Sequence, residues 1–124
     1  MTRIEDLAPD TYSDELHVGF DVRSVGWLGR DVPRTGRVPA VLVEALQHYR
    51  SAAFHDDGDL GSHVCEICGS KAGRGEFWIE WADIRYVLPT LVTHYIDAHD
   101  YLPPDEFLAA LSARWERDRD GSAV

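Results

Sequence analysis

The sequence lacks any hydrophobic stretch approaching the roughly 18 residues that mark a membrane-spanning helix. No apolar run follows the opening residues Met1 to Asp6, so the start does not have the pattern of a secretory signal peptide. We therefore expect a cytoplasmic protein with no membrane partner. Thiols stay reduced in that compartment, so a close pair of cysteines indicates metal binding or redox chemistry rather than a disulfide.

Positive charge is scarce. The chain has 12 Lys and Arg against 22 Asp and Glu, for a net charge of −10, and Lys71 is its only lysine. Binding to nucleic acid depends on clustered cationic side chains that displace counterions, so this balance argues against a nucleic-acid partner. An acidic surface suits solubility or a basic partner, and we expect an unidentified protein partner.

Familiar catalytic motifs are also missing. The sequence contains no His-Glu-x-x-His, and the Gly-rich stretch around Lys71 is not a phosphate-binding Gly-x4-Gly-Lys-Ser/Thr loop. Neither Ser51 nor Ser62-His63 has the surroundings of a nucleophile elbow or a catalytic triad. These absences favour a protein that is not an enzyme.

A metal site is the clearest chemical signal. Cys65 and Cys68 are the only cysteines, and Gly69 after them tolerates the tight backbone turn of a zinc knuckle. Downstream, His94 and His99 lie on a predicted helix. Two thiolates and two imidazoles make a complete tetrahedral ligand set for Zn²⁺. The sequence therefore predicts a structural Cys2His2 zinc site.

The spacing departs from that of a DNA-reading zinc finger. His94 and His99 are five residues apart, which is about 140° around a helix, so they can share an ion only if the last turn loosens. Between Cys68 and His94 lie 25 residues, against about 12–15 in the finger template. A predicted hairpin fills this gap. The resulting order of knuckle, hairpin and helix is nearer to a treble-clef-like arrangement.

Several alternatives remain open. The cysteines can be buried and incidental while the histidines lie on the surface, or the Cys-x-x-Cys pair can be a redox site. His63 is a substitute for one helical histidine, and Asp97 and Asp100 are candidate acceptors for the second N–H of a ligating imidazole. If one histidine is not a ligand, the metal has an open position, and Glu66 or Glu80 becomes a candidate general base.

The N-terminal half predicts strands followed by a helix. Alternating apolar residues predict a half-buried strand over 15–22, and a second short strand is expected over 24–28. After a loop over 29–37, apolar residues at three-and-four spacing predict a helix from Pro39 to about Ala53. Residues 1–13 are expected to form a loosely tied arm, and 55–62 an acidic mobile loop.

The C-terminal half predicts a hairpin and two helices. Residues 69–75 read as a turn-rich connection, and apolar alternation predicts a β-hairpin over about 76–88. Helices are expected over about 89–99 and 104–118, with Pro103 and Pro104 between them and a frayed tail over 120–124. The whole chain, 1–124, is thus expected to be one α+β domain in which 63–104 form a zinc-binding subdomain.

Three motifs carry a resemblance. They are His63-Val-Cys-Glu-Ile-Cys-Gly, Gly75-Glu-Phe-Trp-Ile, and a segment from Tyr86 that contains His94-Tyr-x3-His-x-Tyr-x-Pro-Pro-x-x-Phe. This combination resembles a family of small uncharacterised bacterial proteins, and the likeness covers about residues 15–112. The resemblance implies that the cysteine and histidine positions belong to one design, and it implies no reaction.

Taken together, the sequence favours a small cytoplasmic binding or regulatory module stabilised by Zn²⁺ on Cys65, Cys68, His94 and His99. Four protein ligands would close the coordination sphere, whereas hydrolysis needs an open position. A small zinc-dependent hydrolase is the first alternative. A nucleic-acid-binding zinc finger is the second, and the net charge argues against it.

Overall fold

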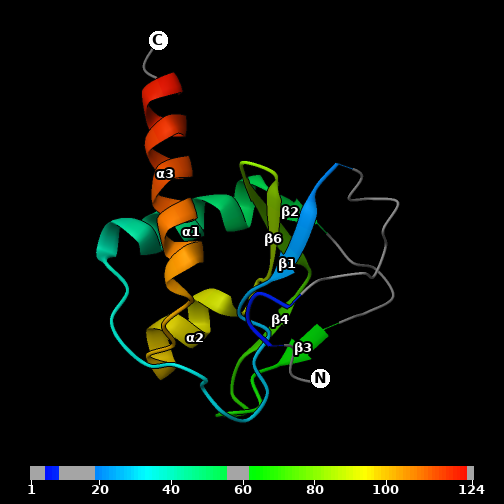
Figure 1. Ribbon diagram of the computed structural model, residues 1–124. Coiled ribbons are helices and arrows are strands. Elements are labelled where there is room, and N and C mark those ends of the chain that lie inside the picture. The colour runs from blue at the N-terminus through cyan, green and yellow to red at the C-terminus, as the bar shows by residue number, and fades with distance from the viewer. Residues whose placement is uncertain (1–4, 9–18, 56–61, 123–124) are drawn as a thin grey trace.

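The described part of the computed structural model contains three helices, a small mixed sheet and a two-stranded sheet (Figure 1), which confirms the predicted α+β class. The structure describes residues 5–8, 19–55 and 62–122. In chain order its elements are β1 (Asp21–Ser24), α1 (Ala40–Ala52), β2 (Phe54–His55), β3 (Ser62–Val64), β4 (Ala72–Arg74), β5 (Glu76–Trp81), β6 (Ile84–Pro89), α2 (Val92–His99) and α3 (Asp105–Ser122).

The main sheet has four strands in the order β1-β6-β5-β2. Its centre is the antiparallel β5–β6 hairpin, which confirms the hairpin predicted from apolar alternation. Helices α1 and α3 pack against β5, on the face to which Phe77 and Ile79 contribute fully buried side chains. The apolar residues of every second strand position therefore form the core between sheet and helices, as their period requires.

The first strand differs from its prediction. Residues 15–18 lie outside the described part of the chain, and β1 spans Asp21–Ser24, where it pairs in parallel with β6. The second strand expected over 24–28 is wrong beyond Ser24. Gly26 has a φ of 82°, which takes the chain out of the extended conformation, and Val25 to Leu28 are buried without belonging to a strand.

The described part of the N-terminal arm is tied to the core. The N–H of Leu7 donates to the carbonyl of Ser24 at 2.7 Å. The Asp6 carboxylate accepts hydrogen bonds from the N–H of Gly26 at 3.0 Å and from the Tyr101 hydroxyl at 2.8 Å. These hydrogen bonds attach residues 5–8 to the core. The rest of 1–13 and residues 56–61 of the predicted acidic loop lie outside the described residues, whereas the end residues of that loop, His55 and Ser62, belong to β2 and β3.

The first two helices agree with the sequence to different degrees. Helix α1 follows Pro39 and buries Leu42, Ala45, Leu46 and Tyr49, so both its start and its apolar stripe are confirmed. Helix α2 begins at Val92 and not at Pro89. Pro89 is the last residue of β6, where it stands opposite Glu76. A proline at a strand end lacks only one ladder hydrogen bond, so the same residue type suits both positions.

A second, two-stranded sheet consists of β3 and β4. The predicted turn-rich connection over 69–75 is therefore partly a strand, Ala72–Arg74. A Cβ atom placed on Gly73 would lie 3.0 Å from Leu91 and from Thr90 Oγ1, so β4 passes closely over the segment that leads into α2. This close passage brings the two cysteines near α2.

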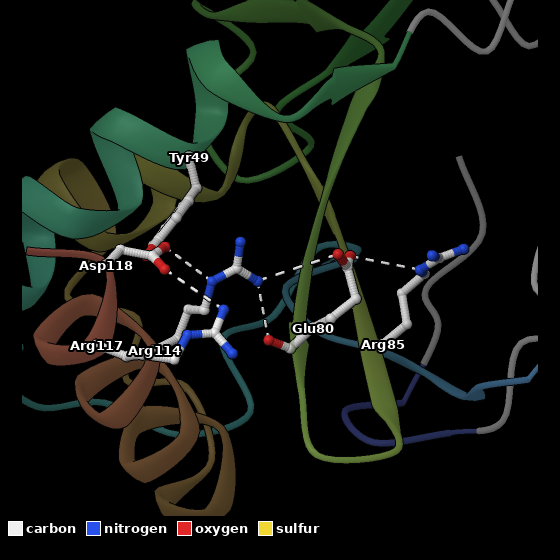
Figure 2. Close-up of polar contacts among 6 residues, drawn as sticks. All are labelled: Tyr49, Glu80, Arg85, Arg114, Arg117 and Asp118. Carbon is white, nitrogen blue, oxygen red and sulfur yellow. Dashed lines mark hydrogen bonds and ion pairs between the residues drawn. The ribbon is translucent and has the colours of Figure 1, made fainter. Parts of the chain in front are cut away.

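Helix α3 extends to Ser122, beyond the predicted end at 118, so residues 120–122 continue the helix instead of fraying. Figure 2 shows how it is fastened: Asp118 accepts from Tyr49 of α1 at 2.6 Å and from Arg114 Nε at 2.8 Å. Arg114 also donates to the carbonyl of Glu80 in β5 at 2.9 Å. Within the described residues, no helix combines the length and apolar character needed to cross a membrane.

Candidate metal centre

The knuckle between β3 and β4 positions the two cysteines. The N–H of Cys65 donates to the carbonyl of Lys71 at 2.8 Å, and the N–H of Gly69 donates to the carbonyl of Cys65 at 2.7 Å. Gly69 has a φ of 69°, a left-handed conformation that favours glycine, in agreement with the tight turn predicted there. The side chain of Cys65 is fully buried in the core, whereas Cys68 is exposed.

Helix α2 supplies both histidines. His94 lies in its first turn and His99 is its last residue. At this end the N–H of Asp100 bonds to the carbonyl of Tyr95, five residues earlier, and the N–H of Tyr101 reaches the same carbonyl at 3.2 Å. An ideal α-helix spans four residues per hydrogen bond, so the last turn is widened. The widened turn is the loosening that the five-residue spacing of His94 and His99 requires. The ring centroids of these two histidines lie 5.0 Å apart.

Two short sulfur–nitrogen distances join the knuckle to the helix. Cys65 Sγ lies 3.4 Å from His99 Nε2, and Cys68 Sγ lies 3.5 Å from His94 Nε2. The four ligand atoms all lie within 4.8 Å of one another. In a tetrahedral Zn²⁺ site with ordinary bond lengths, a sulfur and a nitrogen ligand are separated by about 3.6 Å. The donor set and its spacing therefore suit a metal ion of the zinc type.

Comparison with protein families finds a match over most of the chain. The family described as "Domain of unknown function (DUF7919)" matches residues 2–112, which include all four residues of this group. The chain belongs to the DUF7919 family. No curated protein and no solved structure matches the chain. The DUF7919 match agrees with the resemblance to an uncharacterised family, while a bacterial origin and the shared motif stay predictions.

Ser70 is a site residue of the DUF7919 chain that the sequence reasoning missed. Its hydroxyl lies 3.1 Å from Cys68 Sγ as a hydrogen-bond donor. Hydrogen bonds from the Ser70 side chain and backbone, followed by those from His94 and His99, lower the pKa of the Cys68 thiol to about 5. The thiolate is the form that binds metal. The sequence signal that could have identified Ser70 is its position two residues after the second cysteine.

The structure does not place the other candidate residues, Asp97, Asp100 and His63, in this group of four. Among the described residues, neither the Asp97 nor the Asp100 carboxylate hydrogen-bonds to an imidazole of the group. His63 lies in β3 opposite Gly73, and the group of four is complete without it.

The two candidate general bases, Glu66 and Glu80, have other surroundings than a catalytic base at the metal centre would need. Glu80 in β5 forms ion pairs with Arg85 at 3.4 Å and with Arg114 at 4.0 Å, in the contacts that hold α3. Glu66 is an exposed residue of the knuckle. The arrangement brings together four metal donors and assigns no base to them.

Proposed function

We propose that this DUF7919 protein is a small cytoplasmic binding or regulatory module, held together by a structural Zn²⁺ on Cys65, Cys68, His94 and His99. The observation that carries the proposal is the convergence of two sulfur and two nitrogen donors within 4.8 Å of one another, with two sulfur–nitrogen distances of 3.4 and 3.5 Å. Both cysteines are free thiols, which agrees with a reducing compartment.

In this role the bound ion connects the small β3–β4 sheet to α2. Cys65 and Cys68 come from the knuckle and the histidines from the helix, so one ion would bridge elements distant in sequence. Zn²⁺ supplies charge neutralisation for two thiolates and a fixed geometry, and four protein ligands leave it no position for substrate. The chemistry therefore supports stability and not hydrolysis.

A protein is the partner class that we propose. The net charge of −10 opposes a nucleic-acid partner, because such binding depends on clustered cations. Three large apolar side chains, Val41, Phe54 and Val64, are between 44% and 50% exposed and offer contact points for a partner.

Metal content tests the central claim. Purified wild-type protein should contain about one zinc ion per chain, as expected for one tetrahedral site, when its metal content is measured by elemental mass spectrometry. Cys68→Ser and His99→Ala should lose most of it, while His48→Ala, a histidine of α1 outside the group, should retain it. Zinc-free wild-type protein whose melting is unchanged by a chelator would contradict the proposal.

X-ray absorption at the zinc edge separates the proposed role from the hydrolase alternative. Two sulfur and two nitrogen ligands at about 2.3 and 2.0 Å would support a closed structural site. Three protein ligands with a water oxygen would instead support the zinc-dependent hydrolase and overturn the structural role.

A further inference from the structure

Two hollows adjoin each other beside α1, on the side where β4 and the start of α2 meet it. One has a volume of about 320 Å³ and the other about 390 Å³. Both are lined by Arg50 and Thr90, so they adjoin each other at these two residues, and together they are here called the α1–β4 groove. Each volume lies near the lower end of the range for small-molecule sites, about 300–1,000 Å³.

The α1–β4 groove is positively charged in a strongly acidic protein. Arg50 and Lys71 line the larger hollow, and Arg50 and Arg74 line the smaller one. Among the described residues, Asp97 is the only acidic one in the lining of either hollow. Three of the chain's 12 cationic residues therefore face one groove while the whole chain carries a net charge of −10. Such local concentration of one sign favours an anionic ligand.

Arg50 is held in place for such a ligand. Its Nε donates to the carbonyl of Thr90 at 3.0 Å, and Thr90 is itself 5% exposed, with its hydroxyl donating to the carbonyl of Arg74 at 2.9 Å. The described residues give the two terminal nitrogens of Arg50 no acceptor. A guanidinium fixed at Nε presents its remaining N–H groups as a planar fork, which matches a phosphate or carboxylate group.

We propose that the α1–β4 groove binds a small dianion, either a phosphate ester or a dicarboxylate, between Arg50 and Lys71 with Arg74 at the far end. Two cationic side chains per hollow match two negative charges, and the ammonium of Lys71 adds a point charge to the fork of Arg50. The inference goes beyond the proposed zinc role. It depends on no metal-binding atom, although His94 also lines the larger hollow.

The single lysine permits a direct footprint. In zinc-loaded wild-type protein, the Lys71 ε-amine and the N-terminal amine are the only amines that acetic anhydride can acetylate. Mass spectrometry resolves the two products. At constant ionic strength, phosphate or succinate should slow acetylation of Lys71 several-fold relative to chloride, while the N-terminal amine reacts at an unchanged rate. Protection by phosphate alone would assign a phosphate ester, and protection by succinate alone a dicarboxylate. Protection by both would support the shared oxyanion chemistry.

Charge-loss variants test the residues by nuclear magnetic resonance titration with the same two anions. Arg50→Gln and Lys71→Gln should each raise the Kd about tenfold, the loss expected for one charged contact. Arg30→Gln removes the same charge from an exposed residue outside the groove and should leave the Kd unchanged. Lys71→Gln keeps the hydrogen bond of Arg50 to Thr90, so its result does not depend on that structural contact.

The proposal is overturned if neither anion binds saturably, or if Lys71→Gln binds as tightly as the wild type and the Arg30→Gln control. Zinc content is measured on the same samples. A chain that keeps its zinc but binds no anion refutes the groove alone, whereas anion binding by a zinc-free chain supports the groove and refutes the metal role.

Discussion

Gly26 shows at the scale of one residue why the chain departs from a strand. It has a φ of 82°, and a Cβ atom there would lie 2.7 Å from Val92 Cγ2 of α2. Gly19 has a similar φ of 90°, but nothing lies within 4 Å of its added Cβ. Both glycines therefore adopt a positive φ, and only Gly26 is closely packed against a neighbouring side chain.

We predict that Gly26→Ala lowers the free energy of unfolding by about 3 kcal/mol, from left-handed strain plus overpacking. Gly19→Ala should cost about 1 kcal/mol, from strain alone. Urea denaturation of the two variants and the wild type measures both values. Equal losses in the two variants would show that contact with Val92 contributes nothing.

The grouping of four candidate metal donors was predictable from sequence because their residue types are rare and specific. Cys65 and Cys68 are the only cysteines of the chain, so no other pair competes for the assignment. Ser70 was not predicted, because a serine near a cysteine has many common roles and only the distance of 3.1 Å to Cys68 Sγ identifies this one. The α1–β4 groove was not predictable either, since Arg50 and Lys71 are brought together by tertiary structure.

At the scale of elements, α3 is fastened through the carboxylate of Asp118. It accepts hydrogen bonds from Tyr49 of α1 and from Arg114 of its own helix, and Arg114 continues to β5 (Figure 2). Burial by itself would raise the pKa of Asp118. The hydrogen bonds from Tyr49 and Arg114 and the charge of Arg114 outweigh it, so the pKa lies below its ordinary value of 3.8.

We predict that Asp118→Asn costs about 1–2 kcal/mol of stability at neutral pH, a charged hydrogen-bond contribution reduced by partial exposure. A carboxyl whose pKa is lower in the folded state stabilises the fold above its unfolded pKa. This contribution is lost as pH falls through the lower, folded pKa. The difference between wild type and variant should therefore be constant from about pH 7 to 5 and shrink below about pH 4.

Denaturant titrations across this pH range measure the difference. Asp120→Asn is the matched control, because Asp120 is an exposed carboxylate of the same helix. It should leave stability nearly unchanged at every pH. A difference for Asp118→Asn that does not change with pH would show that the lost contact is steric and not ionic.

Elements with strong local patterns were predicted, and elements fixed by distant contacts were not. The alternation of Phe77 and Ile79 gave the β5–β6 hairpin, and the spacing of Leu42, Leu46 and Tyr49 gave α1. The parallel pairing of β1 with β6 depends on residues about 60 positions apart, which no local pattern encodes. Pro89 was misassigned because proline suits both a strand end and a first helical turn.

At the scale of the whole molecule, the described residues form a main core and a small appendage. The four-stranded sheet and the helices share the buried core, whereas β3 and β4 form a separate sheet with three residues in each strand. An isolated two-stranded hairpin is at best marginally stable in water. Its links to α2 and to the segment that leads into it are the buried Cys65, the close packing of Gly73 on Leu91, the hydrogen bond from Thr90 to the Arg74 carbonyl, and the group of candidate metal donors. Metal binding should therefore matter most in this part of the molecule.

We predict that removing zinc with a chelator raises amide hydrogen exchange first in residues 62–75 and in α2, while β5 and β6 keep their protection. The β5–β6 hairpin buries Phe77, Ile79 and Leu88 against the helices, and this burial does not involve the metal. Exchange measured by mass spectrometry gives the map, and adding zinc back should reverse it. Cys68→Ser without chelator should reproduce the same map, which separates metal loss from side effects of the chelator. An equal rise across β5 and β6 would show that the ion holds the entire core. No rise in 62–75 would show that the two sheets are joined without it.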